Sequence, residues 1–348
     1  MSTATPTAKK ASGIAGSVET EKAAQRSPFA RFTPQQISGA VPAVLFVVLF
    51  VVMISVQGQF SSSLLQTVLE TTVPLMLVGF GQTLVILTRG IDLSVGGIFS
   101  LSTALIATKM TGDGDMVLWI PLVILIGLAA GAINGLLIVR TRMQPFIVTL
   151  ASWSVFSGLA LLALPTEGGS VAPGLTSALS GSALVPKALI LALVLVVVWI
   201  VLRRTRFGTA ILSVGSSEAA AKLNDVPVDR TKIIVYALSG MFAALGALYY
   251  VAVLTFSGSP VAGDPFILQS VAAVVIGGTS LAGGRGSLIG TILGALSLSM
   301  IAQIVFFSGA ESYWSQFVQG MLILGAVLLF AVVELVIRRR NPNATEEA

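Results

Sequence analysis

The sequence predicts an all-α, polytopic membrane protein with about ten transmembrane helices. Of its 348 residues, 55% are hydrophobic and only 10% are charged, whereas a soluble domain carries about 25% charged residues. In lipid, only helices and closed barrels satisfy their backbone hydrogen-bonding groups. The apolar runs of this chain are long and continuous, unlike the roughly ten-residue alternating segments of a barrel. We therefore expect helices that cross a lipid bilayer.

Apolar stretches of about 17 to 25 residues are long enough to span a bilayer. The candidates lie near residues 40–56, 64–88, 92–110, 117–139, 146–164, 186–202, 231–256, 266–280, 287–307 and 317–337. The eighth of these is short and contains Gly277-Gly278. We expect it to be a broken or re-entrant helix.

The remaining segments are polar. Residues 1–38 lack the apolar core of a signal peptide, so we expect a disordered cytoplasmic tail there, and a second cytoplasmic tail at 338–348. Between them, residues 39–337 form the transmembrane domain, whose longest inner loop is 203–230.

The charges give the predicted orientation. With the N-terminus inside, all of the 20 Lys and Arg residues except Lys109 and Lys187 fall on the inner side. The outer loops are expected to contain Asp113, Asp115, Glu167, Asp264 and Glu311. This distribution follows the positive-inside rule and predicts that both termini lie in the cytoplasm.

The chain contains no Cys and no His. Disulfides, thiol nucleophiles, zinc sites with Cys or His ligands and histidine acid–base chemistry are thereby excluded. We expect no catalytic residue, metal site or cofactor in this chain. Its net charge of +5 fits membrane topology better than a nucleic-acid partner.

An acidic residue interrupts the apolar pattern in the segment GQTLVILTRGIDLSVGGIFSL, residues 81–101. We expect Asp92 to cap a helix N-terminus at the inner interface, with Arg89 as a charge partner. A direct role in gating is the alternative. The candidate gating residues in this segment are Asp92, Ser94, Gly96 and Gly97.

A second polar segment, IGGTSLAGGRGSLIG at 276–290, is rich in glycine. A phosphate-cradling loop is excluded because the segment lacks the G-x-x-x-x-G-K-[ST] pattern. We interpret it as a tight glycine turn between two membrane helices. Its candidate pathway residues are Gly277, Gly278, Thr279, Ser280, Gly283 and Gly284.

The inner loop 203–230 contains the stretch SSEAAAKL, in which Ser216 or Ser217 can cap a short helix. A polar helix in an inner loop is a natural docking surface for a cytoplasmic partner.

Together these segments resemble the permease subunits of bacterial ABC importers for ribose, xylose, arabinose, galactose and related monosaccharides. The matching stretches are GQTLVILTRGIDLSVGG, RTRMQPFIVTLAS at 140–152, RRTRFGTAILSVGSSEAAAKLNDV at 203–226 and AAVVIGGTSLAGGRGSLIGT at 272–291. They occur in the family's order and spacing, and the resemblance extends from about residue 40 to 337.

The resemblance implies a fold similar to type II ABC importer permeases, in the inner membrane of a bacterium. It also implies an ABC ATPase subunit that binds ATP and Mg, an extracytoplasmic substrate-binding protein, and a second permease copy or a paralogue. The helix that couples to the ATPase would consist of Glu218, Ala219, Ala220, Ala221, Lys222 and Leu223.

Three positions depart from the family pattern. The family usually has a small residue in place of Arg89, a Gly near Asn224-Asp225, and Glu-Leu-Asp in place of Ile267-Leu268-Gln269. Because of the last change, the resemblance does not determine which solute is transported. The alternatives are a similar permease for branched-chain amino acids or nucleosides, and an ion-coupled secondary carrier, which would work without ATP.

Overall fold

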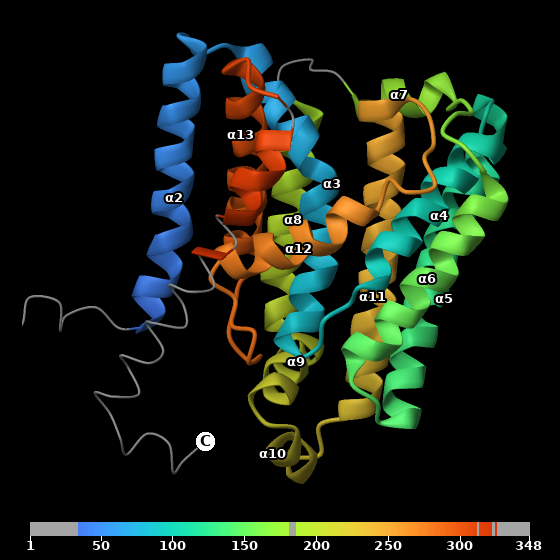
Figure 1. The fold of residues 1–348 in the computed structure, drawn as a ribbon. Coiled ribbons are helices and arrows are strands. Elements are labelled where there is room, and N and C mark those ends of the chain that lie inside the picture. The colour runs from blue at the N-terminus through green and yellow to red at the C-terminus, as the bar shows by residue number, and fades with distance from the viewer. Residues whose placement is uncertain (1–33, 181–185, 312, 322–323, 326–348) are drawn as a thin grey trace, which may run out of the picture.

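The computed structural model describes residues 34–180, 186–311, 313–321 and 324–325, and it confirms the all-α class (Figure 1). Its helices are α2 (Pro34–Gln57), α3 (Ser62–Leu87), α4 (Ser94–Lys109), η2 (Asp113–Asp115), α5 (Met116–Thr141), α6 (Pro145–Ala163), α7 (Pro173–Leu179), α8 (Lys187–Arg204), α9 (Arg206–Ser216), α10 (Glu218–Leu223), α11 (Val228–Tyr249), the π-helix η3 (Tyr250–Thr255) that continues it, α12 (Asp264–Ile276) and α13 (Leu288–Phe307).

The predicted positions of the first nine spans each coincide with a helix, and most of the tenth, 317–337, lies outside the described residues. Five of the described helices are long and apolar enough to cross a membrane, or six if the bent pair α8–α9 is one span. The total of ten spans therefore stays a prediction. Helix α2 begins at Pro34, within the predicted tail 1–38. Residues 1–33 and the tail 338–348 lie outside the described part, so the domain bounds stay a prediction.

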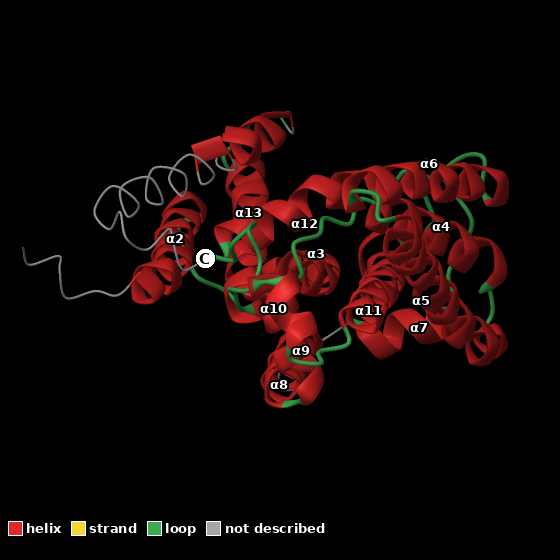
Figure 2. Cartoon of the chain, turned by 90° about the horizontal axis from the view of Figure 1, so that it is seen from below, coloured by secondary structure: helices red, strands yellow, loops and turns green. Residues whose placement is uncertain are grey.

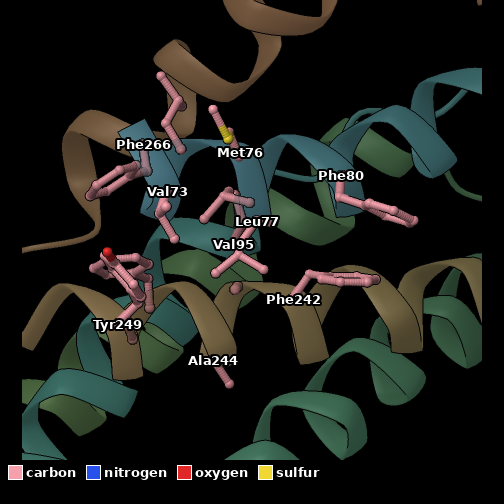
Figure 3. Packing of buried hydrophobic residues seen from close by; sticks show 14 of the residues in the cluster. Val73, Met76, Leu77, Phe80, Val95, Phe242, Ala244, Tyr249 and Phe266 are labelled. Atoms are coloured by element: carbon pink, nitrogen blue, oxygen red, sulfur yellow. The ribbon is translucent and has the colours of Figure 1, made fainter. Parts of the chain in front are cut away.

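Helix α3 is the centre of the bundle and is buried along most of its length. Seen from below, it lies among α11, α12 and α13 (Figure 2). Aromatic and aliphatic side chains fill its contact with α11 (Figure 3), where the rings of Phe80 and Phe242 stack with centroids 4.3 Å apart. Because lipid is as apolar as these side chains, the contact is stabilised by close packing rather than by exclusion of water.

Glycines allow α5 and α11 to approach closely. Gly127, Gly131 and Gly135 recur every four residues and face α11. A Cβ atom at Gly127 would lie 2.5 Å from the carbonyl oxygen of Gly240, and one at Gly131 would collide with the carbonyl oxygen of Tyr236. The backbones are thus in direct contact, as in small-xxx-small packing of membrane helices.

We expect Gly131→Leu to disrupt this contact and Gly158→Leu on α6 to be tolerated. At Gly131 the new side chain meets backbone, which cannot move aside, and overpacking of this kind costs about 1–3 kcal/mol or more. At Gly158 no heavy atom of the described residues lies within 4 Å of the added Cβ. Thermal unfolding of the detergent-purified variants measures the difference. Equal unfolding temperatures for the two variants would contradict close packing of α5 against α11 at Gly131.

Helices α8 and α9 meet at 76°, and α9 and α10 project from the lower end of the bundle (Figure 1). The predicted cytoplasmic cations lie at the ends of helices that meet here, at Arg89, Arg140, Arg203, Arg230 and Arg285. We call this end the basic end.

Helix α12 is too short to cross a bilayer alone, in keeping with the prediction of a broken or re-entrant helix. Its 13 residues extend about 20 Å, less than the roughly 30 Å of a bilayer core, and it lies across the middle of the bundle (Figure 1). After η3 the chain turns back along α4, where Thr103 Oγ1 donates to the Ser259 carbonyl at 2.8 Å and Gly263 N donates to Ser100 Oγ at 2.9 Å. The prediction that Asp264 lies in an outer loop is therefore wrong.

Candidate functional site

A fully buried carboxylate, Asp92, lies between the end of α3 and the start of α4. Its Oδ1 accepts hydrogen bonds from Ser94 N at 3.0 Å and from Ser94 Oγ at 2.6 Å. Its Oδ2 accepts from Ser239 Oγ on α11 at 2.8 Å. Asp92 thus accepts from the first backbone N–H of α4, but the N-cap position of this helix is held by Leu93 and has no side-chain cap. Asp92 also ties α4 to α11.

Two further side chains extend this cluster to α5 and α6. Asn134 Nδ2 donates to Ser94 Oγ at 2.7 Å, and Ser152 Oγ donates to Asn134 Oδ1 at 2.5 Å. We call Asp92, Ser94, Asn134, Ser152 and Ser239 the polar network. Sequence reasoning missed its last three members, because a single polar residue in an apolar helix does not show which neighbour it faces.

The polar network lies inside the bundle and not at the interface. Asn134 is seven residues before the end of α5 at Thr141, which is about 10 Å along the helix. A buried carboxylate is costly unless hydrogen bonds compensate it. Because donors from α4 and α11 supply them, any rearrangement of these helices must exchange the bonds of Asp92.

The prediction that Arg89 pairs with Asp92 is wrong. Arg89 has a positive φ of 65° and points to the end of α9, where its Nε donates to the Gly215 carbonyl and its Nη2 to the Ser216 carbonyl, both at 2.6 Å. A guanidinium at a helix C-terminus satisfies free carbonyls and complements the helix dipole. Arg89 therefore connects the end of α3 to the joint between α9 and α10.

The glycine segment is a turn between α12 and α13, as predicted, and it packs against the same joint. Gly278, Gly283 and Gly284 have φ values of 81°, 80° and 71°, which favour glycine. Gly284 N donates to the Leu87 carbonyl at 3.0 Å, and a Cβ atom at Gly284 would lie 2.6 Å from Ser216 Oγ. The end of α3, the α9–α10 joint and the glycine turn thus converge at the basic end.

The other candidate pathway residues lie in helix contacts or in this turn. Gly96 packs against α12, Gly97 against α6 and Gly277 against α13, each where a Cβ atom would collide. Thr279 is buried, and Ser280 N donates to a carbonyl within the turn. These glycines permit close packing, and a role in gating stays a prediction.

The helix expected to couple to a partner is α10. Ser217 caps it by accepting from Ala220 N at 3.3 Å. Its first residue, Glu218, forms an ion pair with Lys232 on α11, and Ala221 is buried against the bundle. Glu218 and Ala221 therefore hold α10 in place.

The other residues of α10 are exposed. Leu223 is 87% exposed, although it is a large apolar side chain. We define the coupling surface as Ala219, Ala220, Lys222 and Leu223, which share this exposure. Their exposure leaves this face of α10 accessible to the docking partner that the sequence predicts.

Comparison with known proteins identifies the family of this chain. Residues 64–327 match the family model described as branched-chain amino acid transport system / permease component. No solved structure matches the chain.

Curated relatives match over most of their length. The ribose import permease of Bacillus subtilis is 40% identical over 73% of this chain and 80% of its own, and that of Escherichia coli K12 is 36% identical over 78% and 86%. The fructose import permease of Rhizobium meliloti is 34% identical over 83% and 84%.

Proposed function

Because the chain belongs to the branched-chain amino acid transport system / permease component family, we propose that it is the permease subunit of an ATP-driven importer for a monosaccharide. The family and the apolar helices make it a multi-pass protein of the inner membrane. The observation that carries the proposal is the coupling surface, which projects from the basic end and exposes Leu223.

The energy for transport comes from a separate ATPase subunit, which binds ATP and Mg and docks on the coupling surface. A substrate-binding protein delivers the solute at the opposite end of the bundle. A second permease copy or a paralogue completes the translocation path. The match to import permeases over most of the chain supports the ATPase and the substrate-binding protein.

The contacts at the basic end supply a mechanical route from the ATPase to the membrane. Movement of α10 displaces its joint with α9, and that joint is bonded to Arg89 and packed against Gly284. Arg89 lies between the end of α3 and the polar network, and the glycine turn joins α12 to α13. Displacement of the joint is therefore passed to these helices. Two discrete arrangements of these helices then give outward- and inward-open states.

A sugar is favoured over a branched-chain amino acid or a nucleoside by the names of the relatives, which include ribose and fructose import permeases. The test is uptake of a panel of labelled monosaccharides, leucine and adenosine by bacterial cells with and without this gene. We expect loss of uptake of at least one monosaccharide only. Loss of leucine or adenosine uptake alone would assign the permease to another solute.

A further inference from the structure

An exposed carboxylate and an aromatic ring meet on an open face of the bundle. Trp153 Nε1 on α6 donates to Asp264 Oδ1 at the start of α12 at 3.1 Å. Asp264 is exposed and Trp153 is partly buried. Helices α6 and α12 lie along the same side of the bundle when it is seen from below (Figure 2).

Two helices place this pair near the middle of the membrane. Trp153 is eight residues after Pro145, where α6 begins near the basic end, which is about 12 Å along the helix. The residue before Asp264, Gly263, packs on Gly96, two residues into α4 and next to the polar network. A depth of about 12 Å from the basic end of α6 puts the pair well inside the roughly 30 Å hydrocarbon core of a bilayer.

An ionised Asp that faces lipid at this depth costs about 2.5–3.5 kcal/mol on insertion scales, and such residues normally face a water-filled path or a partner. The indole N–H is one donor, and it leaves most acceptor positions of the carboxylate open. The exposed side of Asp264 is therefore expected to face a water-filled path or a partner rather than lipid.

We propose that Asp264 and Trp153 line the translocation path and form a transient contact for a neutral, polyhydroxylated solute. This inference rests on the proposed function and adds a subsite to it. The carboxylate accepts hydrogen bonds from solute hydroxyls, and the flat indole packs against the apolar C–H face of a sugar ring.

Water access can be tested directly because the native chain has no cysteine. Leu268 is one helical turn after Asp264, on the same face, and is 71% exposed. Val155 is 60% exposed but lies about 200° around α6 from Trp153 at similar depth, so it serves as the matched control. The probe is a charged, membrane-impermeant methanethiosulfonate reagent applied to the complete transporter in membranes.

We expect Leu268→Cys and Asp264→Cys to be modified at least tenfold faster than Val155→Cys, and the monosaccharide found in the uptake panel to slow their modification. If neither cysteine reacts faster than the control in any nucleotide state, this face meets lipid or protein and the inference fails. The difference in modification rate can be measured whether or not the chain transports a sugar. Failure of the wild-type chain to transport any monosaccharide would therefore refute the proposed function. Transport of a monosaccharide without this difference in modification rate would refute only the subsite.

Kinetics test the chemistry of the subsite. Asp264→Asn and Trp153→Leu should lower kcat/KM for uptake about tenfold, the size expected for losing one hydrogen bond to a charged group or one stacking surface. Trp153→Phe retains an aromatic face and should be intermediate. If kcat/KM is unchanged in both Asp264→Asn and Trp153→Leu, neither side chain contacts the solute, even if the cysteine experiment shows that the position is accessible to water.

Discussion

Leu223→Asp should weaken binding of the ATPase subunit at least about thirtyfold and abolish ATP-dependent uptake. If Leu223 is a hot spot of the interface, its loss costs about 2 kcal/mol or more, which corresponds to about a thirtyfold change in affinity. Leu223 is the large apolar residue of the coupling surface and is 87% exposed in this chain. Co-purification of the ATPase with the detergent-solubilised permease measures the loss.

Leu223→Met is the control, since it keeps an apolar side chain of similar volume. Both variants should insert and unfold like the wild type, because Leu223 contacts solvent rather than the bundle. If Leu223→Asp still binds the ATPase and still supports uptake, α10 is not part of the docking site. Deletion of 216–223 is a poorer test, because it also removes Ser216, whose carbonyl Arg89 binds.

Asp92→Leu should destabilise the bundle and eliminate uptake, whereas Asp92→Asn should do less damage. Leucine leaves the hydroxyls of Ser94 and Ser239 and one backbone N–H without their acceptor, at about 1–3 kcal/mol for each buried group that finds no new partner. Asparagine keeps the shape and one acceptor oxygen. Thermal unfolding in detergent, with uptake normalised to folded protein, separates stability from transport.

The matched control is Asp229→Leu, an exposed Asp in the first turn of α11. Surface substitutions of this kind change stability by about 0.5 kcal/mol or less. Equal unfolding temperatures for Asp92→Leu and Asp229→Leu would show that the polar network does not hold α4 against α11.

The sequence was sufficient where local chemistry decides the structure. Apolar length predicted the helices, the Ser217 cap preceded α10, and glycines with positive φ formed the turn after α12. These features depend on neighbours within a few residues. They can be recognised without knowing which helices meet.

The remaining features depend on how helices are rotated and placed. Asn134 and Ser239 join Asp92 only because α5 and α11 turn those positions inward. Arg89 binds carbonyls 126 and 127 residues away, and its proximity to Asp92 in the sequence suggested the wrong partner. The sequence pattern predicts that a span ends before Asp264 and leaves it outside, whereas the chain turns back beside α4.

We expect this subunit to conduct a sugar with energy from a separate ATPase. The most direct measurement is uptake of the monosaccharide identified in cells into proteoliposomes that contain the permease and its ATPase. We predict that uptake requires ATP in the lumen and the binding protein outside, and that it persists when ionophores dissipate all ion gradients. Uptake without ATP that follows an imposed proton or sodium gradient would contradict the claim and identify a secondary carrier.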